Sequence, residues 1–377
     1  MIPFAIASPT RILFGRGQAA NAPALIRAFG MRGVIIHGAN EERARWLTKA
    51  LPDALAIACS GEPTLTDLDA ALRRARARAP QWVAAVGGGA VLDMGKALAA
   101  LIPSASPTMD HLEVVGRSLP LTTAPLPFIA IPTTSGTGAE ATRNAVIGVP
   151  DHGRKVSLRD DRMLARLAIV DPSLTDNCPR AVTLASGLDA VTQVIEAFVS
   201  HRATPFTDAV ARPAIADGLS ALKRLMLAED PGARDRMAWV SLCGGLALAN
   251  AGLGAVHGLA GVIGGQTGAA HGAVCGALLP HVLIANRAAA PPGSPAAARL
   301  AEVCAALGQV LGTTAGDAPR ALAAWARGAG LPGLAAQGLR RQHHTGIVTA
   351  AMAATSMRGN PVPLPPEALE AALSAAA

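Results

Sequence analysis

The chain has 377 residues, of which 51% are hydrophobic, 16% charged and 3% aromatic, and its formal net charge is +7. This length suggests about two domains, and the apolar content excludes a disordered chain. A basic balance is compatible with nucleic-acid binding, but the densest arginine cluster, Arg73, Arg74, Arg76 and Arg78, has no interleaved aromatic residues. We interpret it as the solvated face of a helix and expect no nucleic-acid partner.

The five cysteines indicate a reducing compartment, because their number is odd and no pair has CxxC spacing. We expect a cytoplasmic protein without a signal peptide. Residues 237–286 contain no Lys, Arg, Asp or Glu, and the length of this stretch would allow a membrane hairpin. However, histidines and many glycines interrupt it, so we predict buried helices of a globular domain and no membrane partner.

The first half of the sequence alternates short apolar runs with helical patterns. Helical spacing occurs at 41–51 and 91–101. The runs that are typical of buried strands lie at 33–37, 82–86, 128–131 and 167–170. Strands that alternate with helices usually form a parallel sheet covered by helices. We therefore predict an α/β domain over residues 1–175.

Beyond residue 175 the pattern changes to long helical periods without a convincing strand. The predicted helices are 179–199, 206–227, 233–251, 296–307 and 321–327, followed by an Ala-rich last helix at the tail. Ser294 is placed to cap one of these helices, with Pro295 at its first position and Gly308 at its end. We therefore predict an all-helical domain over residues 176–377.

Two glycine-rich loops each follow a predicted strand. Gly87, Gly88 and Gly89 lead into a predicted helix, where backbone N–H groups and the helix dipole favour a phosphate. The loop at 132–140, PTTSGTGAE, adds hydroxyl groups. Either loop alone is compatible with an ordinary turn, and neither is a GxGxxG fingerprint. Because α/β sheets bind ligands at the carboxyl ends of their strands, the two loops together favour a phosphate-bearing ligand.

A second set of residues suggests a metal site. Asp189 and Gln193 are four residues apart and share one face of a helix. A buried Asp is costly unless it is paired or binds a metal; the alternative is an acid in the first helical turn, which would begin at Ser186 and where the helix dipole favours it. His257 and His271 would be about 21 Å apart on one continuous helix, so the GGQTGAAHG segment must break that helix for both to share a metal. One carboxylate and two imidazoles suit Zn²⁺ or Fe²⁺ and leave a position open for a substrate oxygen.

Over nearly its whole length the chain resembles the iron-containing (group III) alcohol dehydrogenases. The matching segments are PTRI at 9–12 with FG at 14–15, GGGAVLDMGKA at 87–97, PTTSGTGAEAT at 132–142, Lys155, AIVDPSLT at 168–175, GLDAVTQVIEAFVS at 187–200, GLGAVHGLAG at 252–261, HGAVCGALLPHV at 271–282, and Asn360-Pro361. Because so many specific segments agree in the same order, chance agreement is excluded.

The resemblance implies a dinucleotide-binding α/β domain, a helical domain of the dehydroquinate synthase-like fold, and catalysis in the cleft between them. It implies that Asp189, His257 and His271 are metal ligands and catalytic residues, with Gln193 as a further metal contact. It implies that NAD or NADP binds to Gly38, Gly88, Gly89, Asp93, Thr133, Thr134, Thr137, Lys155 and Leu174. Association into homodimers is a family expectation.

Three positions depart from the family pattern. Gln193 replaces a usual ligand histidine, and an amide oxygen is a poorer ligand for Fe²⁺, so zinc, weak binding or loss of the metal are the alternatives. Gly261 replaces a histidine, which removes one proton relay. Gly38, Ala39 and Asn40 stand where NAD-preferring members carry Asp just after the strand, and without that carboxylate we expect NADP(H) to be accepted.

The predicted activity is reversible hydride transfer between an alcohol or aldehyde carbon and nicotinamide, with the metal polarising the substrate oxygen. A maleylacetate-reductase-like enzyme that needs no metal is the nearest alternative. A dehydroquinate-synthase-like cyclase is another, although its phosphate pocket rich in Lys and Arg is not evident in the sequence. The third alternative is a degenerate binding protein that has lost catalysis.

Overall fold

The computed structural model describes residues 3–377, and these residues cluster into two compact units. The α/β unit comprises residues 7–134 and 138–176, and the helical unit comprises residues 3–6, 135–137 and 177–377. The helical unit therefore begins at Asn177 and also includes three loop residues, Ser135 to Thr137, which sequence reasoning had placed in the first domain.

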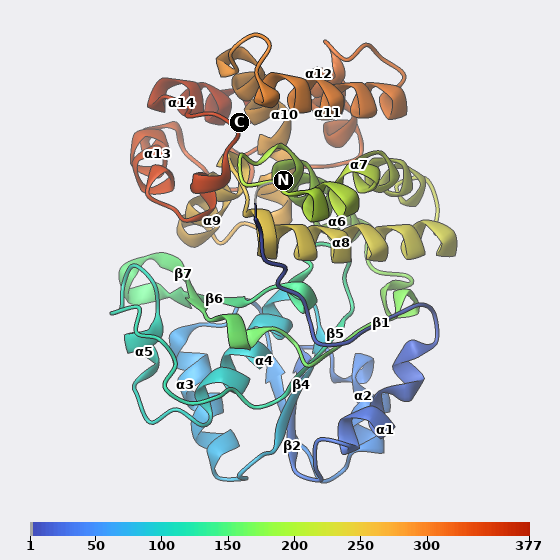
Figure 1. Ribbon diagram of the computed structural model, residues 1–377, viewed down its shortest axis with the longest axis vertical. Coiled ribbons are helices and arrows are strands. Elements are labelled where there is room, and N and C mark those ends of the chain that lie inside the picture. The colour runs from blue at the N-terminus through green and yellow to red at the C-terminus, as the bar shows by residue number, and fades with distance from the viewer. Residues whose placement is uncertain (1–2) are drawn as a thin grey trace. The chain divides into compact units, whose positions relative to one another are not determined.

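The α/β unit is built on a parallel sheet of six strands in the order β1-β8-β5-β4-β2-β3 (Figure 1). The strands are β1 (Ile12–Phe14), β2 (Gly33–Gly38), β3 (Leu55–Cys59), β4 (Trp82–Gly87), β5 (Phe128–Pro132) and β8 (Leu167–Val170). The predicted α/β domain with a parallel sheet is thus confirmed, and the four predicted strands lie within one residue of their predicted bounds.

Helices cover both faces of this sheet because successive strand residues point to opposite sides. Ile35 and Trp82 pack with α1 (Ala22–Arg27) and α2 (Arg45–Ala50), whereas Val34 and Val83 pack with helices of the other face. Those helices are α3 (Leu65–Arg76), α4 (Gly89–Leu101) and the short α5 (Thr108–His111). Strands buried on both faces explain the continuous apolar runs in the sequence.

Some elements of this unit differ from the prediction. The expected helix at 41–51 is divided into a 3₁₀ turn, Glu41–Arg43, and α2, with a bend at Ala44. The short strands β1 and β3 were not predicted, nor was an antiparallel hairpin of β6 (Asn144–Val149) and β7 (Arg154–Arg159). β1 has only three residues and β7 carries mostly polar and charged ones, so their apolar signal is weak. β3 is the apolar run LAIAC, which the prediction overlooked.

The strand order places a topological switch point between β2 and β4. From β2 the chain goes outward to β3, whereas from β4 it goes outward to β5 on the other side. In open α/β sheets, ligands bind outside the carboxyl ends of the strands at such a point. Gly38 ends β2 and Gly87 ends β4, so two of the glycine-bearing turns lie at this position.

Among the described residues, the helical unit contains nine α-helices. The predicted all-helical organisation is confirmed. The helices are α6 (Arg180–Val199), α7 (Pro205–Leu225), α8 (Pro231–Ala251), α9 (Ala255–Thr267), α10 (His271–Ala289), α11 (Pro295–Leu311), α12 (Ala318–Gly328), α13 (His344–Met352) and α14 (Pro366–Ala375). As predicted, Ser294 caps α11 by accepting a hydrogen bond from Ala297 N, and Pro295 is its first residue.

Two predictions about helix ends were wrong. Gly308 does not end α11; the helix continues to Leu311 and ends at Gly312, whose φ of 71° is the left-handed conformation that favours glycine. Gly308 instead faces the backbone of Thr313 and Thr314, where a Cβ would lie 2.8 Å from a carbonyl oxygen. Ser186 does not begin a helix either, because α6 begins at Arg180.

The two helices α6 and α10 cross at close range because α10 presents glycines to α6. A Cβ on Gly272 would lie 2.3 Å from the carbonyl oxygen of Ala185, and one on Gly276 would lie 2.6 Å from a methyl group of Leu188. Small residues allow two helix backbones to approach closely, and a side chain at either position would force them apart. The crossing brings the first turn of α10 beside the middle of α6.

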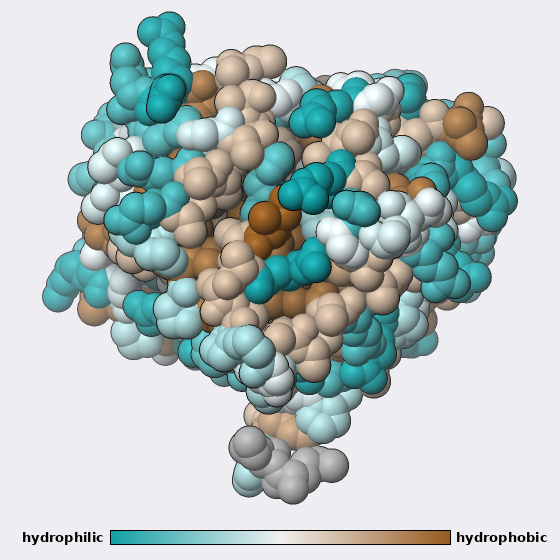
Figure 2. Space-filling model, turned by 90° about the horizontal axis from the view of Figure 1, so that it is seen from above, coloured by the Kyte–Doolittle hydropathy of each residue, from teal (hydrophilic) through white to brown (hydrophobic). Residues whose placement is uncertain are grey.

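Two helices of the described chain, α6 and α10, are long and apolar enough to cross a membrane, and α8 with α9 would add a third only as a pair bent by 102°. Their apolar windows are 83% and 61% buried inside the protein. The face in Figure 2 mixes hydrophilic and hydrophobic residues instead of presenting a continuous apolar band. The apolar surface of these helices is therefore used in packing against their neighbours.

Candidate metal centre and cofactor loops

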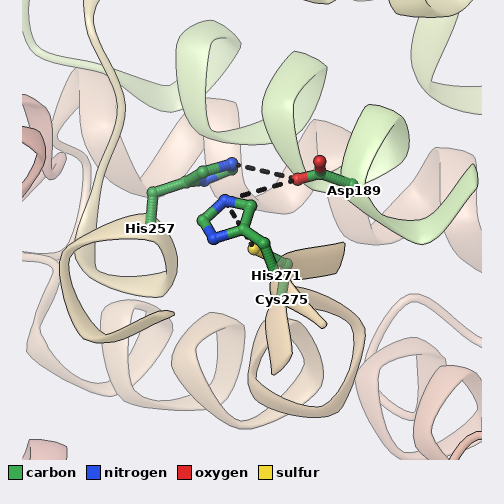
Figure 3. Close-up of side chains that lie close together, drawn as sticks. All are labelled: Asp189, His257, His271 and Cys275. Atoms are coloured by element: carbon green, nitrogen blue, oxygen red, sulfur yellow. Dashed lines mark hydrogen bonds and ion pairs between the residues drawn. The ribbon is translucent and has the colours of Figure 1, made fainter. Parts of the chain in front are cut away.

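Four side chains that can bind a metal converge inside the helical unit (Figure 3). Asp189 comes from α6, His257 from α9, and His271 and Cys275 from α10. One ligand atom from each lies within 4.8 Å of every other. The structure thus brings together the three residues that the sequence predicted as a site, and it adds a thiol.

Asp189 lies in the middle of α6, nine residues after the first residue of this helix. It is therefore not in the first turn, and the alternative of an acid stabilised by the helix dipole was wrong. Its neighbours on the helix are almost entirely buried, and its own side chain is only 4% exposed. A carboxylate in such a position requires a partner of opposite charge.

Asp189 and His257 face each other without forming a hydrogen bond. Asp189 Oδ1 and His257 Nε2 are 3.3 Å apart, and both atoms are buried without a hydrogen-bond partner. His271 Nε2 is 3.9 Å from the same carboxylate oxygen. Atoms that converge at these distances but are not aligned for hydrogen bonding have the arrangement expected of ligands that point at a common ion.

Glu196 fixes the orientation of His257 from behind. Its carboxylate accepts a 2.6 Å hydrogen bond from His257 Nδ1, which leaves Nε2 directed at Asp189. Metal-binding histidines usually have this second partner, which sets the tautomer and the direction of the ring. The same carboxylate accepts hydrogen bonds from the backbone N–H groups of Gly254 and Val256 and so caps α9.

A sharp break between α9 and α10 brings the second histidine to the first. α9 ends at Thr267, Gly268 has a φ of 70°, and α10 begins at His271. The predicted interruption of the helix by the GGQTGAAHG segment is therefore confirmed. The rings of His257 and His271 have centroids 5.4 Å apart.

The charged groups of this cluster shift one another's pKa values. Burial alone would raise the pKa of Asp189, but the two imidazoles lower it below its usual value. Burial would lower the pKa of His271, but Cys275 and Asp189 raise it to about 9. A cation must compete with these protons, because an imidazole binds a metal only when it is neutral.

Gln193, predicted as a further metal contact, lies one turn beyond Asp189 and is buried. Its amide Nε2 donates a 3.0 Å hydrogen bond to the carbonyl oxygen of Thr137. Gln193 therefore ties the loop of residues 135–137 to α6. A histidine at this position would offer a stronger ligand atom to a metal than the amide does.

The predicted cofactor residues lie mostly on the α/β unit. Gly88 is the N-cap of α4, and no side chain caps this end of the helix among the described residues. The first backbone N–H groups of α4 are therefore available to a phosphate. A Cβ on Gly88 would meet the Thr134 hydroxyl at 3.2 Å, so the two glycine-rich loops are adjacent. Thr133 is buried, and its backbone N–H donates to Gly87 O.

Other predicted cofactor residues have protein partners. Asp93 on α4 accepts a hydrogen bond from Val146 N and lies 3.5 Å from the buried Lys96. Lys155 on β7 forms an ion pair with Glu62. These contacts connect the β6–β7 hairpin to the rest of the α/β unit, so both residues have a structural role here.

Two more predicted cofactor positions, Leu174 and Thr137, have contacts of their own. Leu174 lies in the turn after β8 and packs on the core beside α1 and α2. Thr137 belongs to the helical unit, where Gln193 binds its carbonyl group. Gly261, which occupies the position of an expected relay histidine, has open space where a side chain would lie.

Sequence reasoning missed two residues of the site. Glu196 is seven positions after Asp189, and Cys275 is four positions after His271, so each shares a helix face with a predicted ligand. This spacing was the sequence signal that could have identified both residues. Glu196 was overlooked because its partner, His257, comes from a helix whose direction the sequence does not give.

Comparisons with known proteins agree with this architecture. Residues 9–172 match the model of the family "Iron-containing alcohol dehydrogenase", and residues 183–377 match that of "Fe-containing alcohol dehydrogenase family, C-terminal". The "Probable alcohol dehydrogenase EutG" of Escherichia coli (strain K12) is 38% identical over 72% of this chain and 69% of its own.

Solved structures show the same fold over the whole chain. A 1,3-propanediol oxidoreductase superposes with a TM-score of 0.86 at 26% identity, covering 100% of both chains. An alcohol dehydrogenase from Oenococcus oeni has a TM-score of 0.86 at 25% identity and the same coverage. The chain therefore belongs to the iron-containing alcohol dehydrogenase family, and it is an oxidoreductase that acts on CH–OH groups.

Proposed function

We propose that the chain is an NAD(P)-dependent, metal-assisted alcohol dehydrogenase and aldehyde reductase whose ion is held by Asp189, His257 and His271. The observation that carries this proposal is the pair of buried atoms, Asp189 Oδ1 and His257 Nε2, that lie 3.3 Å apart without a hydrogen-bond partner. Burying such atoms without a hydrogen bond costs about 1–3 kcal/mol each. A divalent cation between them would remove that cost.

A bound divalent cation would supply Lewis acidity toward the substrate oxygen, and the nicotinamide would accept or donate the hydride. The protein's own groups prepare this chemistry. Asp189 supplies negative charge, Glu196 holds His257 as the Nδ1–H tautomer, and His271, whose side chain is 34% exposed, leaves the cluster accessible. This exposed side is where a small alcohol or aldehyde would approach.

The cofactor proposal rests on the carboxyl edge of the parallel sheet. Gly38, Gly88 and Gly89 lie at the ends of β2 and β4, beside the switch point, and Thr134 is adjacent to Gly88. The uncapped N-terminus of α4 would bind the pyrophosphate. We keep Asp93, Thr133, Thr137, Lys155 and Leu174 as further predicted cofactor residues, several of which also have the structural contacts described above.

We also propose that the enzyme works in the cytoplasm without a nucleic-acid or membrane partner, and that it forms homodimers as its family does. The reducing compartment is supported by the five cysteines, all of which are free and buried. The arginines at 73, 74, 76 and 78 are exposed on and just after α3, and Arg76 binds backbone carbonyl oxygens at the end of α4.

His271→Ala should abolish metal-dependent turnover of an alcohol, because it removes one of the three proposed ligands. The matched control is His281→Ala, which changes a histidine of the same helix outside the cluster. The measurement is nicotinamide absorbance with an aldehyde panel, before and after treatment with a chelator. Activity that persists unchanged in chelator would contradict the metal role and favour a metal-independent, maleylacetate-reductase-like reaction.

The enzyme should accept NADPH at least as well as NADH, because no carboxylate stands directly after β2 to repel a 2′-phosphate. In this loop Glu42 is paired with Arg45. Gly38→Asp should lower kcat/KM for NADPH relative to NADH by roughly 10-fold or more. A Cβ at Gly38 has its nearest neighbour at 3.9 Å, so the variant can fold. A strong preference of the unmodified enzyme for NADH would show that this inference is wrong.

Glu196→Gln should weaken metal binding by about 10–100-fold, the usual cost of losing a partner that orients a metal-binding histidine. In this variant the new side-chain amide would also place an N–H group against the backbone N–H donors at the start of α9. Asp208→Asn is the control, since it neutralises a carboxylate that binds Arg299 elsewhere in the helical unit. Equal metal affinities of Glu196→Gln and the unmodified protein, measured by calorimetry on folded samples, would rule out the positioning role.

A further inference from the structure

Cys275 is the one member of the metal cluster that neither the sequence prediction nor the proposed function uses. It follows His271 by one helical turn on α10, so the two side chains lie on the same face. Its Sγ is 3.6 Å from His271 Nε2 (Figure 3). The residue is completely buried. Its sulfur is therefore directed into the group of Asp189 and the two histidines.

Two of the distances between these groups match the edges of a coordination tetrahedron, and all four ligand atoms lie within 4.8 Å of one another. With usual zinc bond lengths, two nitrogen or oxygen ligands lie about 3.4 Å apart, and a nitrogen and a sulfur about 3.6 Å apart. The observed separations are 3.3 Å for His257 and Asp189, and 3.6 Å for Cys275 and His271. The edge from His271 to Asp189 is 3.9 Å, and shortening it needs only a small movement of a partly exposed ring.

Other cysteines of the helical unit have different surroundings. Burial raises the pKa of Cys243 to about 12, and the nearby charge of Asp217 adds a smaller rise. Burial also raises the pKa of Cys304. Both are on helices that contribute no residue to the cluster. They are packing residues, whereas Cys275 shares its space with two imidazoles and a carboxylate.

The chain also lacks a histidine at position 193, where the Gln193 amide nitrogen is bound to the Thr137 carbonyl. We propose that Cys275 is a metal ligand that completes an Asp–His–His–Cys set and makes this site selective for zinc over iron. On binding, the thiol releases its proton to solvent and its sulfur forms the bond to the ion, with no change of oxidation state. Thiolate and imidazole ligands in a tetrahedral arrangement favour zinc.

This inference rests on the metal site of the proposed function but goes beyond it in ligand set and metal. A four-ligand zinc site remains compatible with substrate, because zinc can accept a fifth ligand. The approach would be from the side of His271, where the cluster is exposed. A site without the sulfur would instead have three protein ligands and an open fourth position.

The test uses the purified full chain loaded with cobalt and, separately, with zinc. Cobalt-loaded protein should show a near-ultraviolet sulfur-to-cobalt charge-transfer band, and X-ray absorption of the zinc form should give a sulfur at about 2.3 Å. Cys275→Ser should lose the band and bind zinc at least about 10-fold more weakly. Cys304→Ser, which changes an equally buried thiol outside the cluster, should keep both the charge-transfer band and the zinc affinity.

The outcomes separate this inference from the proposed function. If the unmodified enzyme oxidises alcohols with a bound metal but has no sulfur neighbour in X-ray absorption, the Cys275 assignment is wrong and the metal-assisted function stands. A band that persists in Cys275→Ser also overturns the assignment. If the unmodified enzyme binds neither zinc nor cobalt at the cluster, both this inference and the metal-assisted function fail.

Discussion

The site depends on a carboxylate and an imidazole buried together without a hydrogen bond between them. Asp189 Oδ1 and His257 Nε2 lie 3.3 Å apart, and neither atom has a hydrogen-bond partner among the described residues. Desolvation makes such a pair unfavourable unless a positive charge, on the imidazole or on a bound ion, balances the carboxylate. Glu196 prevents the imidazole from turning away, because it binds the opposite ring nitrogen. The same helix, α6, therefore carries both the ligand and the residue that orients its neighbour.

The rest of the helical unit brings the remaining groups to α6. Gly272 and Gly276 let α10 pack directly on α6, and Gly268 allows the chain to turn between α9 and α10. A side chain at Gly254 would not fit, because its Cβ would lie 2.8 Å from side-chain oxygens of Glu196 and Asn360. Glycines thus set the distances between ligands that come from three different helices. Sites built on packed helices in this way hold their geometry better than sites on loops.

The sequence predicted the two kinds of unit and the three residues that converge, because apolar periodicity and family motifs are both local signals. It did not reveal that Glu196 reaches His257 or that Gln193 binds the Thr137 carbonyl, since these contacts depend on how helices cross and where a loop lies. The break at Ala44 and the continuation of α11 past Gly308 were missed because tertiary contacts decide them. Cys275 was overlooked because a single buried cysteine usually serves packing.

Anomalous X-ray diffraction from crystals of the metal-loaded enzyme tests the central claim most directly. Data collected on both sides of the absorption edges of zinc and iron would locate an ion and identify it. We expect one strong peak at bonding distance, about 2 Å, from Asp189 Oδ1, His257 Nε2 and His271 Nε2. A peak outside this cluster, or a hydrogen bond between Asp189 and His257 with no peak between them, would contradict it.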